Sequence, residues 1–136
     1  MRQRSATNRI IFHHSLSQDV SAATIADWHR KRGMDTIGYH FVIREDGRVE
    51  KGRDVSMIGA HAKGRNSDSI GVCLTGDFSR HSPDARQVVA AAKLYKEMCG
   101  LYGKELEVEY HRNTVNPCPG ALLCRDVFTA RMHRGR

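Results

Sequence analysis

The chain has 136 residues, of which 40% are hydrophobic and 27% charged, and this composition is typical of one soluble globular domain. A chain of this length can bury a core without a disulfide framework, and no apolar run approaches the roughly 20 residues of a membrane-spanning helix, so we expect no membrane insertion. The formal net charge of +7 favours polyanionic partners. Nucleic acid and the bacterial cell wall both qualify, and charge alone does not choose between them.

Residues 1–8 form a basic N-terminal arm that lacks the apolar segment of a secretory signal, so we expect the protein to be made in the cytoplasm. The cysteines include no CxxC pair, which argues against a cysteine-rich structural zinc site. Cys73 falls in an apolar run and Cys99 in a helical pattern, and both are expected to be small buried side chains.

The first half of the chain alternates between strand and helix patterns. Residues 9–14 are a short apolar run with β-branched and aromatic side chains, which predicts a buried strand. From Ser21 the spacing of apolar residues predicts a helix that stops near Gly33. Residues 39–44 and 49–51 are predicted to form a hairpin, because Asp-Gly stands in the turn between them.

The second half continues the alternation. Residues 70–74 are predicted as a buried strand, and a helix is predicted to start at Ser82, as its capping residue, and to run toward Gly100. Residues 106–110 alternate as a half-exposed strand does, and a last helix is expected after Gly120. This order predicts an α/β fold: a single domain, residues 1–136, with a central mixed β-sheet flanked by helices.

Two imidazoles and one thiol stand at or just beyond predicted strand ends: His13, His111 and Cys118. Neighbouring strand ends meet at one rim of a sheet, and these three groups would form a zinc site whose fourth position holds water. Zinc lowers the pKa of that water to about 7 and polarises a carbonyl, as amide hydrolysis requires. On spacing alone, surface histidines and a buried cysteine remain the alternative interpretation.

Six blocks of sequence, in this order, resemble the type 2 N-acetylmuramoyl-L-alanine amidase family, which includes phage lysozymes of the T-odd coliphage kind and animal peptidoglycan recognition proteins. The blocks are IIFHHS (10–15), GYHFVI (38–43), GAHAKG (59–64), NSDSIGV (66–72), HR (111–112) and CPG (118–120). The resemblance covers roughly residues 9–128. It implies that family's fold and a hydrolase that cuts peptidoglycan between the muramoyl lactyl group and the first L-alanine of the stem peptide.

The resemblance also implies the cofactor and its ligands: one zinc ion per chain, held by His13, His111 and Cys118. Strand geometry agrees that only one of His13 and His14 faces the metal. The family's active-site tyrosine matches Tyr39, and the resemblance implies that its hydroxyl contacts the zinc-bound water or the developing oxyanion. For Tyr39 alone, an aromatic side chain in the core is the alternative.

The loop that matches the substrate cleft of the family contains His61, Lys63 and Arg65. We expect these side chains to bind glycan or stem peptide, with a structural role for His61 and solvated charges at the other two as alternatives. One position departs from the family. Its members carry a lysine or threonine two residues before the metal cysteine, where this chain has Asn116. Asn116 is kept as a catalytic candidate. The segment 111–118 looks one residue shorter than the commonest pattern, so the alternatives are that Thr114 faces the cleft or that neither residue does.

A small basic amidase without a signal fits a monomeric phage or prophage endolysin, which waits in the cytoplasm until a separate membrane pore releases it to the wall. A cytoplasmic recycling amidase is a rival with the same chemistry. A non-catalytic peptidoglycan-binding module is a rival of another class, although such relatives usually lose the cysteine that Cys118 matches. Some phage members also inhibit a polymerase, and the basic arm allows polymerase or nucleic-acid binding without arguing for it.

Overall fold

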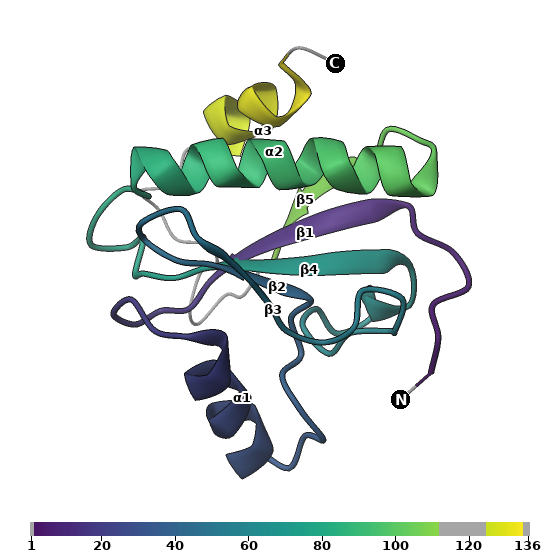
Figure 1. Ribbon diagram of the computed structural model, residues 1–136, viewed down its shortest axis with the longest axis vertical. Helices are drawn as coiled ribbons and strands as arrows, with labels where there is room; N and C mark the ends of the chain where they lie inside the picture. Colours follow the sequence, from purple (N-terminus) through teal and green to yellow (C-terminus); the bar gives the residue numbers. More distant parts are fainter. Residues whose placement is uncertain (1, 112–124, 135–136) are drawn as a thin grey trace.

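The computed structural model describes residues 2–111 and 125–134, in which a five-stranded sheet lies between helices (Figure 1). The elements in chain order are β1 (Arg9–His14), α1 (Ala22–Lys31), β2 (Phe41–Ile43), β3 (Val49–Lys51), the 3-10 helix η1 (Asn66–Asp68), β4 (Ser69–Leu74), α2 (Ala85–Tyr102), β5 (Glu107–Tyr110) and α3 (Arg125–His133). The strands are ordered β3-β2-β4-β1-β5, with β3 antiparallel to β2 and the other neighbours parallel. This arrangement confirms the predicted α/β fold with a central mixed sheet.

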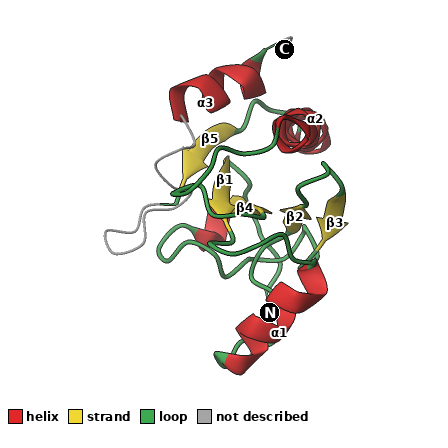
Figure 2. Cartoon of the chain, turned by 90° about the vertical axis from the view of Figure 1, so that its left-hand side faces the viewer, coloured by secondary structure: helices red, strands yellow, loops and turns green. Residues whose placement is uncertain are grey.

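The helices cover both faces of the sheet. Figure 2 shows α2 and α3 together on one face and α1 on the other. Side chains alternate along a strand, so Ile10 and Phe12 of β1 join the core under α2 and α3, whereas His13 turns toward the face that carries α1. None of the helices in the described ranges is long and apolar enough to cross a membrane.

The larger core lies between the sheet and the pair α2 and α3. Phe12 packs edge-on against Phe128 of α3, with ring centroids 4.9 Å apart. Tyr95 of α2 is fully buried, and its hydroxyl donates to the carbonyl of Leu106 at 2.6 Å. Cys73 and Cys99 are both buried free thiols, which confirms their predicted placement.

Helix α1 begins as predicted, because the Ser21 hydroxyl accepts a hydrogen bond from the amide of Thr24. The predicted start of α2 is wrong. Its N-cap is Asp84, two residues beyond Ser82. Asp84 and Gln87 form a reciprocal capping box. The Asp84 side chain accepts a hydrogen bond from the backbone amide of Gln87, and the Gln87 side chain accepts one from the backbone amide of Asp84. Ser82 is exposed and has no such partner three residues on in the sequence.

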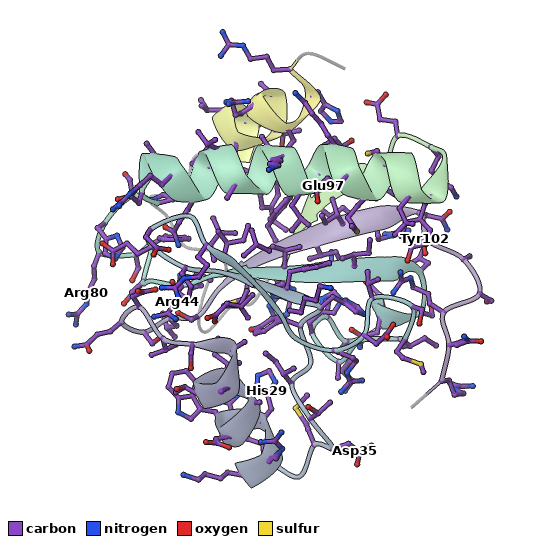
Figure 3. The ribbon with its side chains drawn as sticks, viewed as in Figure 1. His29, Asp35, Arg44, Arg80, Glu97 and Tyr102 are labelled. Atoms are coloured by element: carbon purple, nitrogen blue, oxygen red, sulfur yellow. The ribbon has the colours of Figure 1, made fainter. Side chains whose placement is uncertain are left out.

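The predicted basic arm is folded against the body of the molecule. Arg4 is the anchor, because its guanidinium donates to the Tyr102 hydroxyl at 2.8 Å and to the Met57 carbonyl at 3.0 Å. It also lies over the Tyr102 ring at 5.4 Å, near the C-terminal end of α2, where Figure 3 labels this tyrosine. The charge of Arg4 is therefore committed to internal contacts.

Candidate active site

The two histidines predicted as zinc ligands lie side by side. Strands β1 and β5 pair Phe12 with Tyr110. The residues that follow this pair are His13, still on β1, and His111, directly beyond the end of β5. The amide of His111 donates to the carbonyl of Phe12 at 3.3 Å, and the ring centroids of His13 and His111 are 4.8 Å apart. The parallel register thus brings together two side chains that are 98 positions apart in the sequence.

His14 turns to the opposite face, as strand alternation predicts. Its Nδ1 accepts a hydrogen bond from the amide of Phe78 at 3.0 Å, and its ring lies 5.6 Å from the Phe78 ring. The remaining members of the predicted set, Cys118 and Asn116, lie outside the described residues. Their roles stay predictions.

Burial keeps both site histidines neutral. The side chain of His13 is 1% exposed, and burial lowers its pKa well below the usual range, with the neighbouring imidazoles of His61 and His111 lowering it further. The pKa of His111 is also lowered, first by burial and then by the charge of Arg65. A neutral imidazole is the form that binds a metal ion.

The donor chemistry of these two side chains fits zinc. Paired neutral imidazoles are common zinc ligands, and a catalytic site needs one further protein ligand. Within residues 2–111 and 125–134, no three histidine, cysteine or acidic side chains are grouped so as to hold a metal. The third ligand predicted from the sequence, Cys118, falls in the gap between those ranges.

Tyr39 lies next to His13 on the same face of the sheet. Its half-buried ring is 5.0 Å from the His13 ring and 5.4 Å from the ring of His29. Figure 3 shows His29 on α1, on the side toward the sheet, and its Nδ1 accepts a hydrogen bond from the amide of Gly38 at 2.8 Å. A side chain at Gly38 would clash with the carbonyl of Ala60. Helix α1 therefore holds the segment that carries Tyr39, a role for His29 that the sequence did not indicate.

His61 is buried behind His13. Its Nδ1 lies 2.9 Å from Nε2 of His13, and its Nε2 lies 3.2 Å from the hydroxyl of Ser69. Burial lowers the pKa of His61 well below the usual range. Both ring nitrogens thus have partners within the protein. The structural role for His61, left open by the sequence, gains a geometric basis, and substrate contact stays a prediction.

The two cations of the same loop differ in their surroundings. Lys63 is exposed. Arg65 is half-buried and donates to Glu109 at 2.9 Å and, more weakly, to the carbonyl of Tyr110 at 3.4 Å, directly before His111. Glu109 also pairs with Arg9 at 2.7 Å. Arg65 therefore ties the loop to the end of β5, and a role for either cation in binding substrate stays a prediction.

Besides the role of His29, sequence reasoning missed two residues that support the site. Ser69 contacts His61, and Glu109 holds Arg65. Ser69 lies within the block NSDSIGV and Glu109 within a predicted strand, so both belong to segments that were singled out without a role for these residues. Neither residue type signals chemistry by itself, and their contacts join segments that only the folded chain brings together.

Comparison with known proteins agrees with this geometry. Residues 3–121 match the family model described as N-acetylmuramoyl-L-alanine amidase. An endolysin of Enterobacteria phage K11 is 36% identical over 138 residues, spanning 96% of this chain and 91% of the phage protein. Peptidoglycan-recognition protein 2 of Holotrichia diomphalia is 35% identical over 136 residues, spanning 90% of this chain and 72% of that protein. 

The fold also matches a solved structure. The amidase LysC of Clostridium intestinale superposes with a TM-score of 0.85 at 29% identity, over 93% of this chain and 85% of that one. The fold expected from the six sequence blocks, a central mixed sheet flanked by helices, is thereby confirmed.

Proposed function

The chain belongs to the N-acetylmuramoyl-L-alanine amidase family, and we propose that it is a zinc-dependent peptidoglycan hydrolase of the endolysin kind. The bond cut would be the amide between the lactyl group of N-acetylmuramic acid and the L-alanine that begins the stem peptide. One observation carries the proposal: His13, His111 and Tyr39 meet on one face of the sheet, within the span that matches the family.

The chemistry of the donors supports zinc. A zinc site that catalyses hydrolysis takes three protein ligands and keeps one position open. His13 and His111 supply neutral imidazoles, and we propose Cys118 as the third ligand. When bound there, zinc would lower the pKa of a coordinated water to about 7 and polarise the scissile carbonyl.

The side chains around the zinc ligands would orient the substrate and stabilise the transition state. The hydroxyl of Tyr39 would donate a hydrogen bond to the oxygen that gains negative charge in the transition state. Contact with His13 and His29 on two sides restricts the Tyr39 ring, so the hydroxyl is pre-positioned. Lys63 is exposed on the neighbouring loop and is suited to meet a carboxylate of the stem peptide.

Product analysis on purified sacculi tests the reaction. We expect new alanine amino termini and no new reducing sugar ends, because an amidase leaves the glycan strands intact. A glycosidase would give the reverse and would need two carboxylates at a fixed separation. Reducing ends without free alanine amine would contradict the proposed bond.

Metal analysis tests the cofactor. The purified protein should contain about one zinc per chain, and chelation should abolish activity until zinc is restored. His13→Ala and His111→Ala should each lose bound zinc and activity. His81→Ala is the matched control, because His81 is exposed and its Nδ1 contacts the carbonyl of Ser82. Full activity in the metal-free protein would end the zinc mechanism.

The same experiments separate the rivals. The likeness to a peptidoglycan-recognition protein keeps a non-catalytic binding module in consideration. Such a module would bind sacculi without releasing alanine amino termini. A recycling amidase would prefer small soluble muropeptides to intact sacculi, whereas an endolysin would degrade the intact wall. Monomeric state, release from the cytoplasm and polymerase binding stay predictions, to be checked by light scattering, fractionation and pull-down.

A further inference from the structure

A buried line of hydrogen bonds runs from His13 into the protein and ends on the backbone. Nε2 of His13 lies 2.9 Å from Nδ1 of His61, and Nε2 of His61 lies 3.2 Å from the hydroxyl of Ser69. The Ser69 hydroxyl donates to the carbonyl of Arg65 at 2.6 Å. The side chains of His13, His61 and Ser69 are all buried.

The positions of the protons follow from the far end of this line. A serine hydroxyl has one proton, and here it is donated to the Arg65 carbonyl, so the Ser69 oxygen can only accept from His61. Nε2 of His61 must therefore carry a proton. A neutral imidazole carries a single proton, so with Nε2 protonated the Nδ1 of the buried His61 has a lone pair and can only accept from His13. The proton of His13 then sits on Nε2, and its Nδ1 is left without one.

The ring of His61 fills a space beside two glycines, which fixes its position. A side-chain carbon at Gly71 of β4 would lie 2.4 Å from Cγ and Cδ2 of His61, and one at Gly59 would lie 2.7 Å from Cδ2. Two glycines thus leave the space that the ring fills. The backbone on either side of the ring is also held, because the amides of His61 and Ala62 both donate to the Asn66 side chain at 2.9 Å.

We propose that His61 and Ser69 are positioning residues that hold the proton of His13 on Nε2, so that Nδ1 is the nitrogen available to a metal ion. The part concerning the metal rests on the proposed function, whereas the position of the proton does not. The second partner of a ligating histidine commonly selects its tautomer in this way, and loss of such a partner typically costs 10–100-fold in metal affinity or activity. The carbonyl of Arg65 is the fixed acceptor on which the whole line depends.

The first experiment reads the tautomer directly in metal-free protein at neutral pH. Two-bond proton–nitrogen NMR spectra distinguish a protonated from an unprotonated ring nitrogen. In the wild type we expect His13 as one tautomer, with its proton on Nε2. Ser69→Ala should give a mixture at His13, because His61 loses the acceptor that fixes its own proton. A wild-type spectrum with the His13 proton on Nδ1 would overturn the proposal.

Matched variants of His61 sharpen the test. His61→Leu removes the acceptor and should also give a mixture at His13, whereas His61→Asn can place an amide oxygen near the position of Nδ1 and should restore the single tautomer. Thr7→Val is the control for loss of a buried hydroxyl, because Thr7 bonds to Arg4 and not to this line. If His61→Leu does not fold, Ser69→Ala alone decides. An unchanged single tautomer in the variants without the acceptor would overturn the proposal.

The second experiment measures zinc affinity by competition with a chromophoric chelator. His61→Leu should bind zinc 10–100-fold more weakly than the wild type, and Ser69→Ala about tenfold more weakly. His61→Asn and Thr7→Val should stay close to the wild type. Unchanged affinity in both His61→Leu and Ser69→Ala would overturn the positioning role. Failure of the wild type to bind zinc would instead refute the proposed function. The NMR result would then still decide whether His61 and Ser69 hold the proton of His13 on Nε2.

Discussion

Buried imidazoles are the most unusual residues of this molecule. Of the eight histidines in the sequence, five are buried: His13, His14, His29, His40 and His61. Each accepts or shares a hydrogen bond within the protein, which offsets the cost of removing a polar ring from water. Burial favours the neutral form of an imidazole, so protonation of these histidines at low pH should lower the stability of the folded state.

His40 gives a defined dependence of stability on pH. Its Nδ1 accepts from the amide of Gly71 at 2.9 Å, its Nε2 lies 2.7 Å from the Met57 carbonyl, and burial lowers its pKa to about 4. In the unfolded chain the pKa is about 6.5, so below that pH the unfolded chain binds the proton first. The stability that neutral His40 provides is therefore complete above pH ~6.5, is lost as the pH falls toward ~4, and changes no further below that.

The expected loss for His40 alone is about 2 kcal/mol between pH 7 and pH 5. Urea unfolding of the wild type and of His40→Asn at both pH values measures it, since the asparagine oxygen can still accept from the Gly71 amide. Subtracting the loss of the variant removes what is common to the two proteins, and the wild type should lose about 2 kcal/mol more than the variant. Equal losses would show that His40 does not titrate as its burial implies.

Tyr39 and Asn116 should differ in their importance for the reaction. Tyr39→Phe keeps the ring beside His13 and His29 and removes only the hydroxyl, so we expect a rate loss on the order of a hundredfold. Asn116→Ala should cost less than about tenfold, because an amide carries neither charge nor a titratable proton. Rate constants on one defined muropeptide, with zinc content measured, compare the two. Equal damage from both would mean that Asn116 has taken over the role of the family lysine or threonine.

At the scale of elements, the start of α2 can be tested by a matched pair. Asp84→Ala removes the carboxylate that accepts from the amide of Arg86, together with one half of the capping box, and should lower the free energy of unfolding by about 1 kcal/mol. Ser82→Ala should change it by less than about 0.5 kcal/mol, as for an ordinary surface position. Chemical denaturation of both variants decides, and a larger effect at Ser82 would restore the start predicted from the sequence.

The turn between β2 and β3 packs against α2 through Gly47. Both Gly47 and Gly103 have positive φ, at 88° and 66°. A side chain at Gly103 would enter open space, whereas one at Gly47 would lie 2.9 Å from the carbonyl of Arg86. Gly103→Ala should therefore cost about 1 kcal/mol from backbone strain alone. Gly47→Ala should cost roughly 1–3 kcal/mol more, from overpacking, as thermal or urea unfolding would measure. Equal costs would mean that the turn moves freely away from α2.

These elements show what the sequence could and could not predict. Strand β1 was predicted with its observed bounds, because a parallel strand buried on both faces is a continuous apolar run. The turn at Gly47 was recognisable from Asp-Gly, since local chemistry determines it. The cap of α2 was misplaced because Ser82 and Asp84 are both good capping residues, and only the pairing with Gln87 separates them. 

The candidate site divides along the same line. His13 and His111 were predicted because they stand in blocks that resemble the family, whereas their spacing at predicted strand ends alone left surface histidines as the alternative. The contact of His61 with both His13 and Ser69 was not, because it depends on how a loop folds over the sheet. A serine and a glycine carry no signal for that in the sequence.

At the scale of the whole molecule, the charge is unevenly committed. Several arginines are paired within the structure, among them Arg44 with Asp19 and Glu50, and Arg9 with Asp68 and Glu109. The net charge of +7 therefore resides in the cations beyond these pairs. Such an excess of positive charge attracts a polyanionic wall. Salt limits the range of this attraction, because the screening length is about 10 Å at 0.1 M ionic strength.

Ionic strength should thus separate binding to the wall from the reaction itself. Lysis of intact cells or sacculi should slow as salt rises, because the attraction is screened. Turnover of a small soluble muropeptide should respond much less. Parallel assays from low to high salt on the two substrates make the comparison. An equal response would mean that the charge does not direct the protein to the wall.

The adjacent histidines of β1 have a consequence for how this fold can change by insertion and deletion. Loss of Arg9 would move residues 10–14 back by one place along the strand and exchange the faces on which they lie. His14 would then occupy the position that His13 now holds, so an imidazole would still face His111. Ile10 and Phe12, however, would be removed from under α2 and α3, and the core would lose them. A one-residue shift of this strand would thus keep a histidine at the position that faces His111. The loss of core packing would be the only selection against such a shift.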